Sequence, residues 1–399
     1  MKIAICMMRC LGVGYGSVKA AVNLANELVK RNNDVSFLCY DETQEKLEFK
    51  LDPRVYFFNL AKVRPVRLLK VSKIIIKILY NIPSILPFFL YKHIGESLYQ
   101  LRWFIQENIA PVWAWKIAFN RGGYDVVSVH GSDAISIVPF AVNTKRTKLI
   151  ITLHSRPQAE IEGFSLNKII FRAKVKGLNR ANKITVLQKK FIAEARGYCQ
   201  DTKKLVYIPN FIYEFTRDRH KHIGNHVNII AIGNLVKEKN FDILIQALAI
   251  VRSDNWSCDI WGKDCGEKET LKKMIEKNKL ENRVFLKGFT NSIEKEIEKA
   301  HVIIQPSLFE GFPLAVSEAM ARGVVPIGFS SCSGINDLIS DHYNGLLSKE
   351  NDAAGLARLI DYLIGNPELY VKLSRNAVES IRKYNPESIM PEWEKLIHE

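Results

Sequence analysis

Two glutamates close together in one apolar segment are the residues best suited to chemistry. The segment PSLFEGFPLAVSEAMARG spans residues 306–323 and contains Glu310 and Glu318. A carboxylate among so many apolar side chains is costly unless it is hydrogen-bonded. Because hydroxyl groups are good donors to carboxylates, the pair points to a ligand with several hydroxyls.

The same segment predicts the start of a helix. Pro313 sits where proline best begins one. The free amides of Leu314, Ala315 and Val316 would then carry the partial positive charge of the helix end into a cleft. Such a helix start suits a phosphate group.

A nucleotide sugar would satisfy all of these groups. Its diphosphate would lie on the helix amides, its ribose diol on Glu318 and its hexose hydroxyls on Glu310. In the alternative, Glu310 caps the helix and Glu318 pairs with a basic side chain. The spacing alone does not decide between the two.

Alternating strands and helices must position this segment. The chain opens with strand, glycine loop, helix and strand, in KIAIC, LGVGYGS, VKAAVNLANELVKRN and DVSFLCY. In that helix the periodicity turns Lys19 away from the apolar face. Further strand-like runs are RVYFF, YDVVSVH, KLIITLH, NKITVL and KLVYIP. Residues 1–210 are therefore predicted to form one α/β domain.

A second series follows a polar, basic segment, 211–226, which is predicted to be a linker. Its strands are predicted in VNIIAIG, SCDIWG, RVFLKG, HVIIQP, VVPIGF and NGLL, so a second domain should cover 227–385. A final helix, 386–399, is predicted to complete the first domain. The expected fold is two Rossmann-like, doubly wound domains facing each other across a cleft, with ligands at the carboxyl ends of the strands.

Composition limits the class of protein and its partners. The chain has 399 residues, 47% hydrophobic and 25% charged, as expected for a soluble protein with two cores. The formal charge of +15 implies an anionic partner: nucleic acid, a phosphorylated small molecule or an acidic membrane. No basic stretch is interleaved with aromatic residues on a nucleic-acid-binding module, so nucleic acid is not expected.

Other features predict a cytoplasmic protein without a metal site. The 7 cysteines have no paired framework and should be reduced thiols. The N-terminal MKIAICMM is too short for a signal peptide, and the longest apolar run, 78–91, is too short for a spanning helix. His220, His222 and His226 cluster in a basic segment without cysteine, which favours a solvated linker over a metal site.

The segment with the two glutamates resembles the signature of family 4 retaining glycosyltransferases of the GT-B fold. The segments AIGNLVKEKNFDILIQAL, NRVFLKGF, YNGLL and VYIPN, and the N-terminal glycine loop, occur in the family's order. The resemblance therefore covers nearly the whole chain. It implies a transferase of bacterial surface polysaccharide or lipopolysaccharide synthesis, with acceptor binding on the N-terminal domain.

The resemblance also implies a role for each matching residue. It assigns the donor sugar to Glu310 and His154, the ribose to Glu318 and the diphosphate to Lys239. Further donor-binding positions are Gly14, Gly16, Asn234, Phe289, Gly311, Phe312, Pro313, Leu314, Ala315 and Val316. Gly14 and Gly16 match the glycine loop, and Phe289 matches the place where the base meets the main chain. His130 is expected to be a satisfied histidine at the edge of the cleft.

Two residues depart from the family's pattern. Asn234 stands where an arginine usually lies beside the diphosphate, so Lys237, Lys239 or the helix amides would have to supply that charge. Gln188 replaces a serine that is common at its position, and the sequence predicts no consequence of this change.

The resemblance implies chemistry without a cofactor or metal. A hexose or N-acetylhexosamine would pass from a nucleotide-diphosphate sugar, such as a UDP-sugar, to a glycan acceptor, with retention of configuration. Glu310 is assigned to binding and no second carboxylate is placed for a covalent intermediate, so a displacement on the same face, assisted by the leaving diphosphate, is implied.

Two alternatives remain open. An enzyme of the same fold that does not transfer, such as a nucleotide-sugar epimerase, should have additional catalytic acids in the cleft. A catalytically silent protein of this fold would bind the donor without hydrolysing or transferring it.

A basic segment of the N-terminal domain suggests a membrane surface. Residues 62–95 contain no acidic residue, and their cations are Lys62, Arg64, Arg67, Lys70, Lys73, Lys77 and Lys92. Apolar residues beside cations are typical of segments that lie on anionic lipid. We therefore expect a lipid-linked acceptor and a peripheral position on the cytoplasmic face of the inner membrane. The alternative is a core helix with a solvated lysine face.

Overall fold

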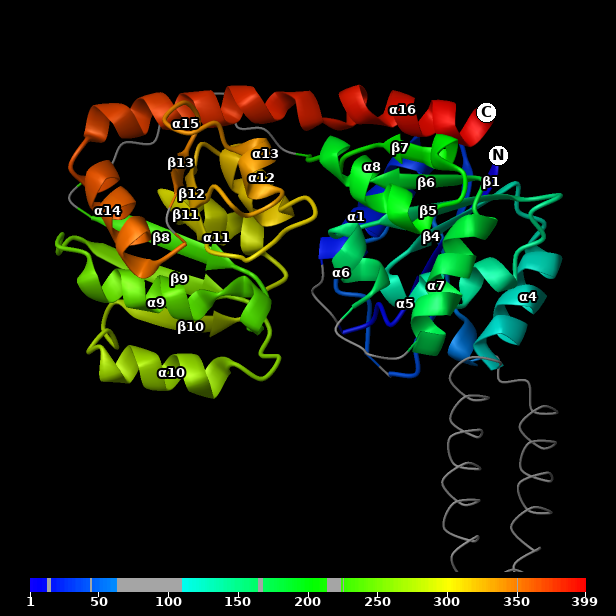
Figure 1. Cartoon of the computed structure of the whole chain (residues 1–399), viewed down its shortest axis with the longest axis horizontal. Helices are drawn as coiled ribbons and strands as arrows, with labels where there is room; N and C mark the ends of the chain where they lie inside the picture. Colours follow the sequence, from blue (N-terminus) through cyan, green and yellow to red (C-terminus); the bar gives the residue numbers. More distant parts are fainter. Residues whose placement is uncertain are drawn as a thin grey trace, which may run out of the picture.

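The computed structural model describes residues 1–12, 16–43, 45–62, 110–163, 168–213, 224, 226–349 and 351–399. These residues form two parallel β-sheets, each covered by helices on both faces, so the predicted pair of Rossmann-like domains is confirmed. Figure 1 shows the two domains side by side. Gly14 and nearly all of the basic segment 62–95 lie outside the described residues.

The N-terminal sheet has seven strands in the order β3-β2-β1-β4-β5-β6-β7. Its strands are β1 (Lys2–Met8), β2 (Asp34–Tyr40), β3 (Tyr56–Asn59), β4 (Val126–His130), β5 (Lys148–Leu153), β6 (Lys183–Val186) and β7 (Leu205–Tyr207). Every neighbouring pair is parallel. The strands read as continuous apolar runs because both faces of the sheet are buried.

The C-terminal sheet has six strands in the order β10-β9-β8-β11-β12-β13, again all parallel. They are β8 (Val227–Ile232), β9 (Trp256–Trp261), β10 (Val284–Gly288), β11 (Val302–Gln305), β12 (Val325–Phe329) and β13 (Leu346–Ser348). In both sheets the winding direction reverses beside the first strand, between β1 and β4 and between β8 and β11. A crevice at the carboxyl ends of the strands is expected at such a reversal.

Helices fill the connections between the strands. In the N-terminal domain they are α1 (Gly16–Lys30), α4 (Ala110–Gly122), α5 (Ser132–Ile135), α6 (Pro157–Ile161), α7 (Lys168–Arg180) and α8 (Lys189–Ala195). The C-terminal domain contains α9 (Phe241–Ile250), α10 (Lys268–Lys277), α11 (Ile293–Lys299), α12 (Leu314–Met320), α13 (Ile335–Leu338), α14 (Ala353–Ile364) and α15 (Pro367–Ile381). Of the helices in the described ranges, none has both the length and the apolarity needed to cross a bilayer.

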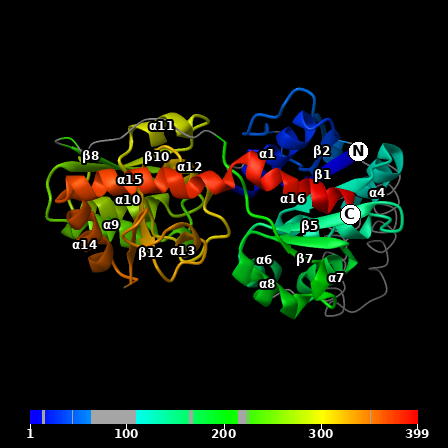
Figure 2. The same cartoon turned by 90° about the horizontal axis from the view of Figure 1, so that it is seen from above.

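The last described helix, α16 (Pro386–His398), returns to the N-terminal domain. Figures 1 and 2 show α15 over the C-terminal domain and α16 continuing the same line over the N-terminal domain. Trp393 is buried at 5% exposure, and Glu394 approaches Arg31, which directly follows α1 (Oε1 to Nε, 3.4 Å). The α16 helix thus joins the core of the N-terminal domain from the far end of the sequence.

The connection between the domains differs from the expected solvated linker at its start. Phe211 and Ile212 are buried, and the Ile212 amide donates to the Tyr384 carbonyl at 2.8 Å. Residues 214–223 and 225 lie outside the described residues, and with them His220 and His222. His226 lies 2.9 Å from the Ser257 hydroxyl (Nε2 to Oγ).

Candidate functional site

A cavity of about 570 Å³ lies between the two domains. Its walls are the loops and helix starts at the carboxyl ends of the strands in both sheets, where the reversals predict a crevice. The predicted residues in its lining are Gly16, His154, Asn234, Lys239, Phe289, Glu310, Gly311, Phe312, Pro313, Leu314, Ala315 and Glu318. The fold therefore brings together residues that are distant in the sequence.

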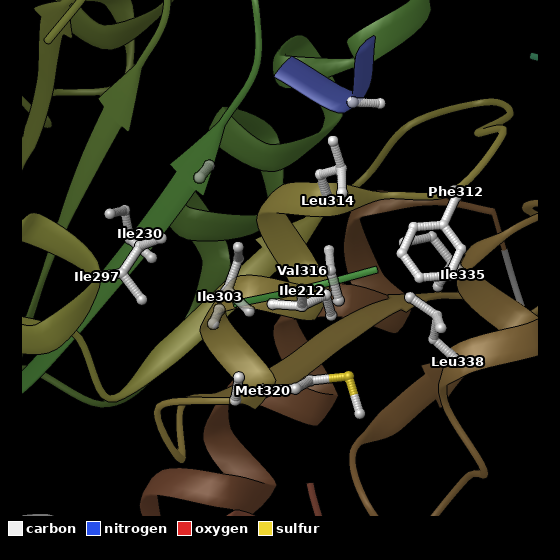
Figure 3. Packing of buried hydrophobic residues seen from close by; sticks show 14 of the residues in the cluster. Ile212, Ile230, Ile297, Ile303, Phe312, Leu314, Val316, Met320, Ile335 and Leu338 are labelled. Carbon is white, nitrogen blue, oxygen red and sulfur yellow. The ribbon is translucent and has the colours of Figure 1, made fainter. Parts of the chain in front are cut away.

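One predicted residue does not line the cavity. Val316 is 1% exposed, and Figure 3 shows its side chain among the apolar residues of the C-terminal core. Pro313 precedes α12 as its N-cap rather than occupying its first turn, so the helix begins one residue later than expected. The register of this short helix turns Val316 toward the core and Leu314 and Ala315 toward the cavity.

Glu310 is held by two donors of the C-terminal domain. Its Oε1 atom accepts from Lys239 Nζ at 2.6 Å and from Gln305 Nε2 at 3.0 Å. Lys239 ends the short 3-10 helix η6 (Lys237–Lys239), and Gln305 ends β11. The alternative in which Glu310 caps α12 is wrong, because no side chain caps that helix. Within the described ranges no donor contacts Oε2 of Glu310, so this oxygen is open to a ligand.

Glu318 is paired across the domain boundary. Its Oε1 atom lies 2.7 Å from Nζ of Lys19, which also lies 3.1 Å from Oε1 of Glu294 on α11. Glu318 thus pairs with a basic side chain, as the alternative required, but that lysine also lines the cavity. The Lys19 side chain is only 18% exposed, so the expectation that it faces away was wrong. Helical periodicity describes packing on a helix's own sheet and carries no signal from a facing domain.

Two histidines form a chain that ends at the cavity. His130 lies between the Ser128 hydroxyl (Nε2 to Oγ, 2.9 Å) and His154 (Nδ1 to Nε2, 2.8 Å). Burial and the neighbouring His154 lower the pKa of His130, and burial lowers the pKa of His154 to about 4. Both rings are therefore neutral at neutral pH. His154 lines the cavity, and its Nδ1 is buried without a partner among the described residues.

The Glu310 loop touches the N-terminal domain directly. A Cβ atom on Gly311 would lie 1.9 Å from the His154 carbonyl oxygen, so glycine is needed there for close approach. Gln188, which follows β6, donates through Nε2 to the carbonyls of Glu310, at 3.2 Å, and of Gly311. The sequence predicted no consequence of having Gln188 where the family commonly has serine. In the structure, Gln188 has the role of linking the two domains.

A buried carboxyl group in the cavity wall was not predicted. Glu160 of α6 is 5% exposed, and its Oε2 atom accepts from the Ser155 amide at 2.8 Å. Burial raises its pKa to about 7, against the opposing effects of the Ser155 amide, Lys174 and the His154 amide. Lys174 Nζ donates to the Glu160 carbonyl at 2.8 Å and to the Ser132 hydroxyl at 2.6 Å. A lone glutamate in a short helix gave no sequence signal.

Asn234 and Phe289, two further predicted positions, lie next to Lys263. Asn234 accepts from the Lys263 amide (Oδ1 to N, 3.3 Å), and Phe289 carries Lys263 Nζ above its ring at 4.7 Å. Lys263 also pairs with Glu48 of the N-terminal domain at 2.6 Å. Lys237 is exposed and absent from the lining, so Lys239 is the better placed of the two candidate lysines.

A second cavity of about 710 Å³ adjoins the first. Phe49 lines both cavities. The second cavity lies within the N-terminal domain, and its wall combines apolar residues such as Phe57 with acidic and basic ones such as Glu42 and Lys46. The two cavities are therefore neighbours on either side of Phe49.

Models of two glycosyltransferase families match successive parts of the chain. The one described as Glycosyltransferase Family 4 matches residues 15–213, and the one described as Glycosyl transferases group 1 matches residues 213–380. The chain is 24% identical over 391 residues to an uncharacterized glycosyltransferase of Haemophilus influenzae, covering 97% of each. It is 31% identical over 201 residues to the poly(ribitol-phosphate) alpha-N-acetylglucosaminyltransferase of Staphylococcus aureus, covering 50% of this chain and 40% of the relative.

Solved structures show the same architecture. TarM of S. aureus, in complex with fondaparinux, alpha-GlcNAc-glycerol and UDP, has a TM-score of 0.76 at 18% identity, over 100% of both chains. HepE of Anabaena in complex with UDP has a TM-score of 0.72 at 18% identity, also over 100% of both chains. At these identities the likeness establishes the fold. That fold is GT-B. The two family matches, which together span residues 15–380, show that the chain belongs to the family 4 glycosyltransferases.

Proposed function

We propose that this glycosyltransferase moves a hexose or N-acetylhexosamine from a nucleotide-diphosphate sugar to a glycan acceptor, with retention of configuration. The observation that carries the proposal is the pair Glu310 and Glu318 in one cavity wall. Each has one carboxylate oxygen bound by a lysine, and for neither does a described donor contact the other oxygen. Two open carboxylate oxygens suit the hydroxyls of a sugar and of a ribose.

The donor is proposed to be a UDP-sugar. The TarM and HepE structures contain UDP, and the staphylococcal relative is named as an N-acetylglucosaminyltransferase. In this arrangement Glu318 binds the ribose, Glu310 and His154 the transferred sugar, and Lys239 lies near the diphosphate. The base is proposed to lie against the main chain at Phe289, beside Lys263.

The proposed reaction is a displacement on one face of the sugar. The acceptor oxygen forms a bond to the anomeric carbon while the bond from that carbon to the diphosphate breaks, and the hydroxyl proton moves to the leaving diphosphate. Glu310 and the neutral His154 hold the sugar and do not react covalently. We propose that the reaction requires neither a cofactor nor a metal.

The acceptor is proposed to be a lipid-linked glycan used in cell-surface polysaccharide synthesis. The second cavity, which meets the first at Phe49, supports an acceptor path on the N-terminal domain. The basic segment 62–95 supports docking on an anionic membrane. Vesicle sedimentation tests this: binding should need anionic lipid, weaken at high salt and weaken when Lys70, Lys73 and Lys77 become glutamate. Equal sedimentation of that variant and the parent would remove the docking segment from the proposal.

A panel of nucleotide sugars tests the central proposal. A ligand at about 100 times its Kd should stabilise the protein by about 2.7 kcal/mol, which a thermal-shift assay detects. The stabilising donor should then be consumed only when a glycan acceptor is added. Glu160, in the cavity wall, is an additional acid of the kind that an epimerase would need. A reaction with the donor and without an acceptor is therefore the necessary control. A changed sugar without acceptor would favour an epimerase, and binding without any turnover would favour a silent protein.

A further inference from the structure

Two side chains of the N-terminal domain reach the two glutamates of the donor site. Lys19 lies in the first turn of α1, and Gln188 lies between β6 and α8. Neither was assigned a role from the sequence. Lys19 contacts the carboxylate of Glu318, whereas Gln188 contacts the main chain at Glu310.

The Gln188 side chain forms hydrogen bonds across the domain boundary. Gln188 is the N-cap residue of α8, yet its side chain makes no capping hydrogen bond. Its amide nitrogen instead donates to the consecutive carbonyls of Glu310 and Gly311. The side chain is 3% exposed, so these bonds form away from water, where a missing donor is costly. Serine, the short residue common in the resembling family, would favour capping α8 instead.

Lys19 forms ion pairs with two carboxylates of the C-terminal domain. Glu318 and Glu294 lie 2.7 and 3.1 Å from its ammonium group, and the Glu318 side chain is 11% exposed. Burial lowers the pKa of Lys19, but the opposite effect of Glu318 and Glu294 is larger. The pKa is therefore raised overall, and the ammonium stays charged. Without this cation the two carboxylates would repel each other, and the Glu318 side chain would turn away from Glu294.

We propose that Gln188 and Lys19 are positioning residues for different halves of the donor. Gln188 fixes the main chain at the glutamate that binds the sugar, and Lys19 fixes the carboxylate that binds the ribose. Since both come from the N-terminal domain, each half of the donor is held fully only when the domains are closed. This inference rests on the proposed donor site and adds two residues to it.

The test compares two substitutions with two probes, UDP and UDP-N-acetylglucosamine. Lys19→Met should weaken UDP binding about tenfold in calorimetry, and Lys19→Arg should restore most of the affinity. Gln188→Glu has nearly the same shape but replaces the donor by an acceptor facing two carbonyls. It should leave the Kd of UDP within about twofold and lower kcat for sugar transfer at least about tenfold.

Lys190→Met is the matched control. Lys190 also bridges the domains, through Asn336 at 2.8 Å and Asp337 at 3.1 Å, but it does not line the cavity. The Lys190→Met variant should change neither the Kd of UDP nor kcat for sugar transfer. Thermal unfolding without ligand identifies a variant that fails to fold, and in that case Lys19→Arg and Gln188→Asn carry the comparison.

Three results would overturn the inference. They are tighter UDP binding in Lys19→Met, equal effects of Lys19→Met and Lys190→Met, or unchanged transfer in Gln188→Glu. A parent protein that binds no nucleotide and transfers no sugar would instead refute the proposed function. The two failures are therefore distinguishable.

Discussion

At the level of single residues, Glu310 and Glu318 are bound in the same way. In each, a lysine binds one carboxylate oxygen, while no described donor contacts the other oxygen. The lysines have different origins, because Lys239 belongs to the same domain as Glu310, whereas Lys19 reaches Glu318 from the opposite domain. The carboxylates should therefore respond differently to substitution.

We predict separate losses for the two alanine variants. Glu318→Ala removes the proposed ribose contact, so it should weaken both free UDP and the UDP-sugar, by roughly 1.5 to 3 kcal/mol for a charge-assisted hydrogen bond. Glu310→Ala should leave the affinity for UDP largely intact and suppress transfer. Calorimetry with UDP and initial rates of transfer measure the two effects. Equal loss of UDP affinity in both variants would contradict this division.

Glu160 should make stability depend on pH. Its pKa, raised by burial to about 7 from an ordinary 4.5, means that the folded protein binds a proton which the unfolded chain releases between these values. Its contribution to stability is therefore present below pH 4.5 and is lost as the pH rises to 7, with a change of about 3 kcal/mol.

Glu160→Gln keeps the shape and the acceptor for the Ser155 amide but removes the charge. Urea unfolding of parent and variant at a series of pH values should show the variant gaining relative stability from pH 4.5 to 7. A difference that stays constant over this range would mean that Glu160 does not titrate there.

The sequence revealed part of the site because some residues belong to a local pattern. Glu310, Glu318 and Lys239 lie at fixed places in segments that follow strands, so their common location could be predicted. Lys19 and Gln188 could not be assigned, because their contacts depend on how the facing domain docks. Gln305 was missed because a glutamine at the end of an apolar strand has no distinctive spacing.

At the level of elements, glycines set how closely segments approach. The loop before α12 passes the end of β5 with no room for a side chain at Gly311. Gly262, after β9, is equally confined, since its Cβ would lie 1.8 Å from the Gly233 carbonyl oxygen. The first contact crosses the domain boundary, whereas the second lies within the C-terminal domain.

These two glycines should therefore differ when replaced by alanine. Gly311→Ala can be relieved if the domains separate, so we expect transfer to fall while thermal unfolding stays nearly unchanged. Gly262→Ala has no such escape and should destabilise the C-terminal domain, by about 1–3 kcal/mol as for overpacking. Gly197→Ala, with no atom within 4 Å of the added Cβ, is the neutral control. Solution scattering would detect the opening, and an unchanged, active Gly311→Ala variant would refute this account.

The strands were predictable from the sequence because a parallel sheet covered on both faces consists of continuous apolar runs. Each expected run, from KIAIC to NGLL, overlaps a strand of the structure. The exact start of α12 was less predictable, because Pro313 has no amide hydrogen and fits on either side of a helix start. Leu314, Ala315 and Val316 still form the first turn, and the Val316 side chain packs in the core.

At the level of the whole molecule, α16 ties the two ends of the sequence together. Arg31, which directly follows α1, lies 3.4 Å from Glu394 of this helix, and Lys183 of β6 lies 2.8 Å from its C-cap residue Glu399. Its buried face includes Met390 and Trp393. The stability of the N-terminal domain should therefore depend on residues far from it in the sequence.

Trp393→Ala tests this dependence. Removing a buried tryptophan typically costs about 3 to 5 kcal/mol, and here the loss should fall on the N-terminal domain. Glu392, exposed on the same helix, gives the control Glu392→Ala. Hydrogen exchange should show faster opening of β1 and β6 in Trp393→Ala and unchanged exchange in β8 and β9. Equal loosening of both sheets would mean that α16 stabilises the interface between the domains.

The position of α16 also sets an order of events during translation. All strands of the N-terminal sheet leave the ribosome before the C-terminal domain is made, but the helix that covers this sheet follows that domain. At about 5–20 residues per second, the apolar surface under Trp393 would remain open for on the order of ten seconds. The C-terminal domain, whose strands and α9 to α15 are contiguous, can meanwhile fold as a unit. The later half of the polypeptide is thus the first that can finish folding, and the earlier half is the one that a chaperone would have to shield.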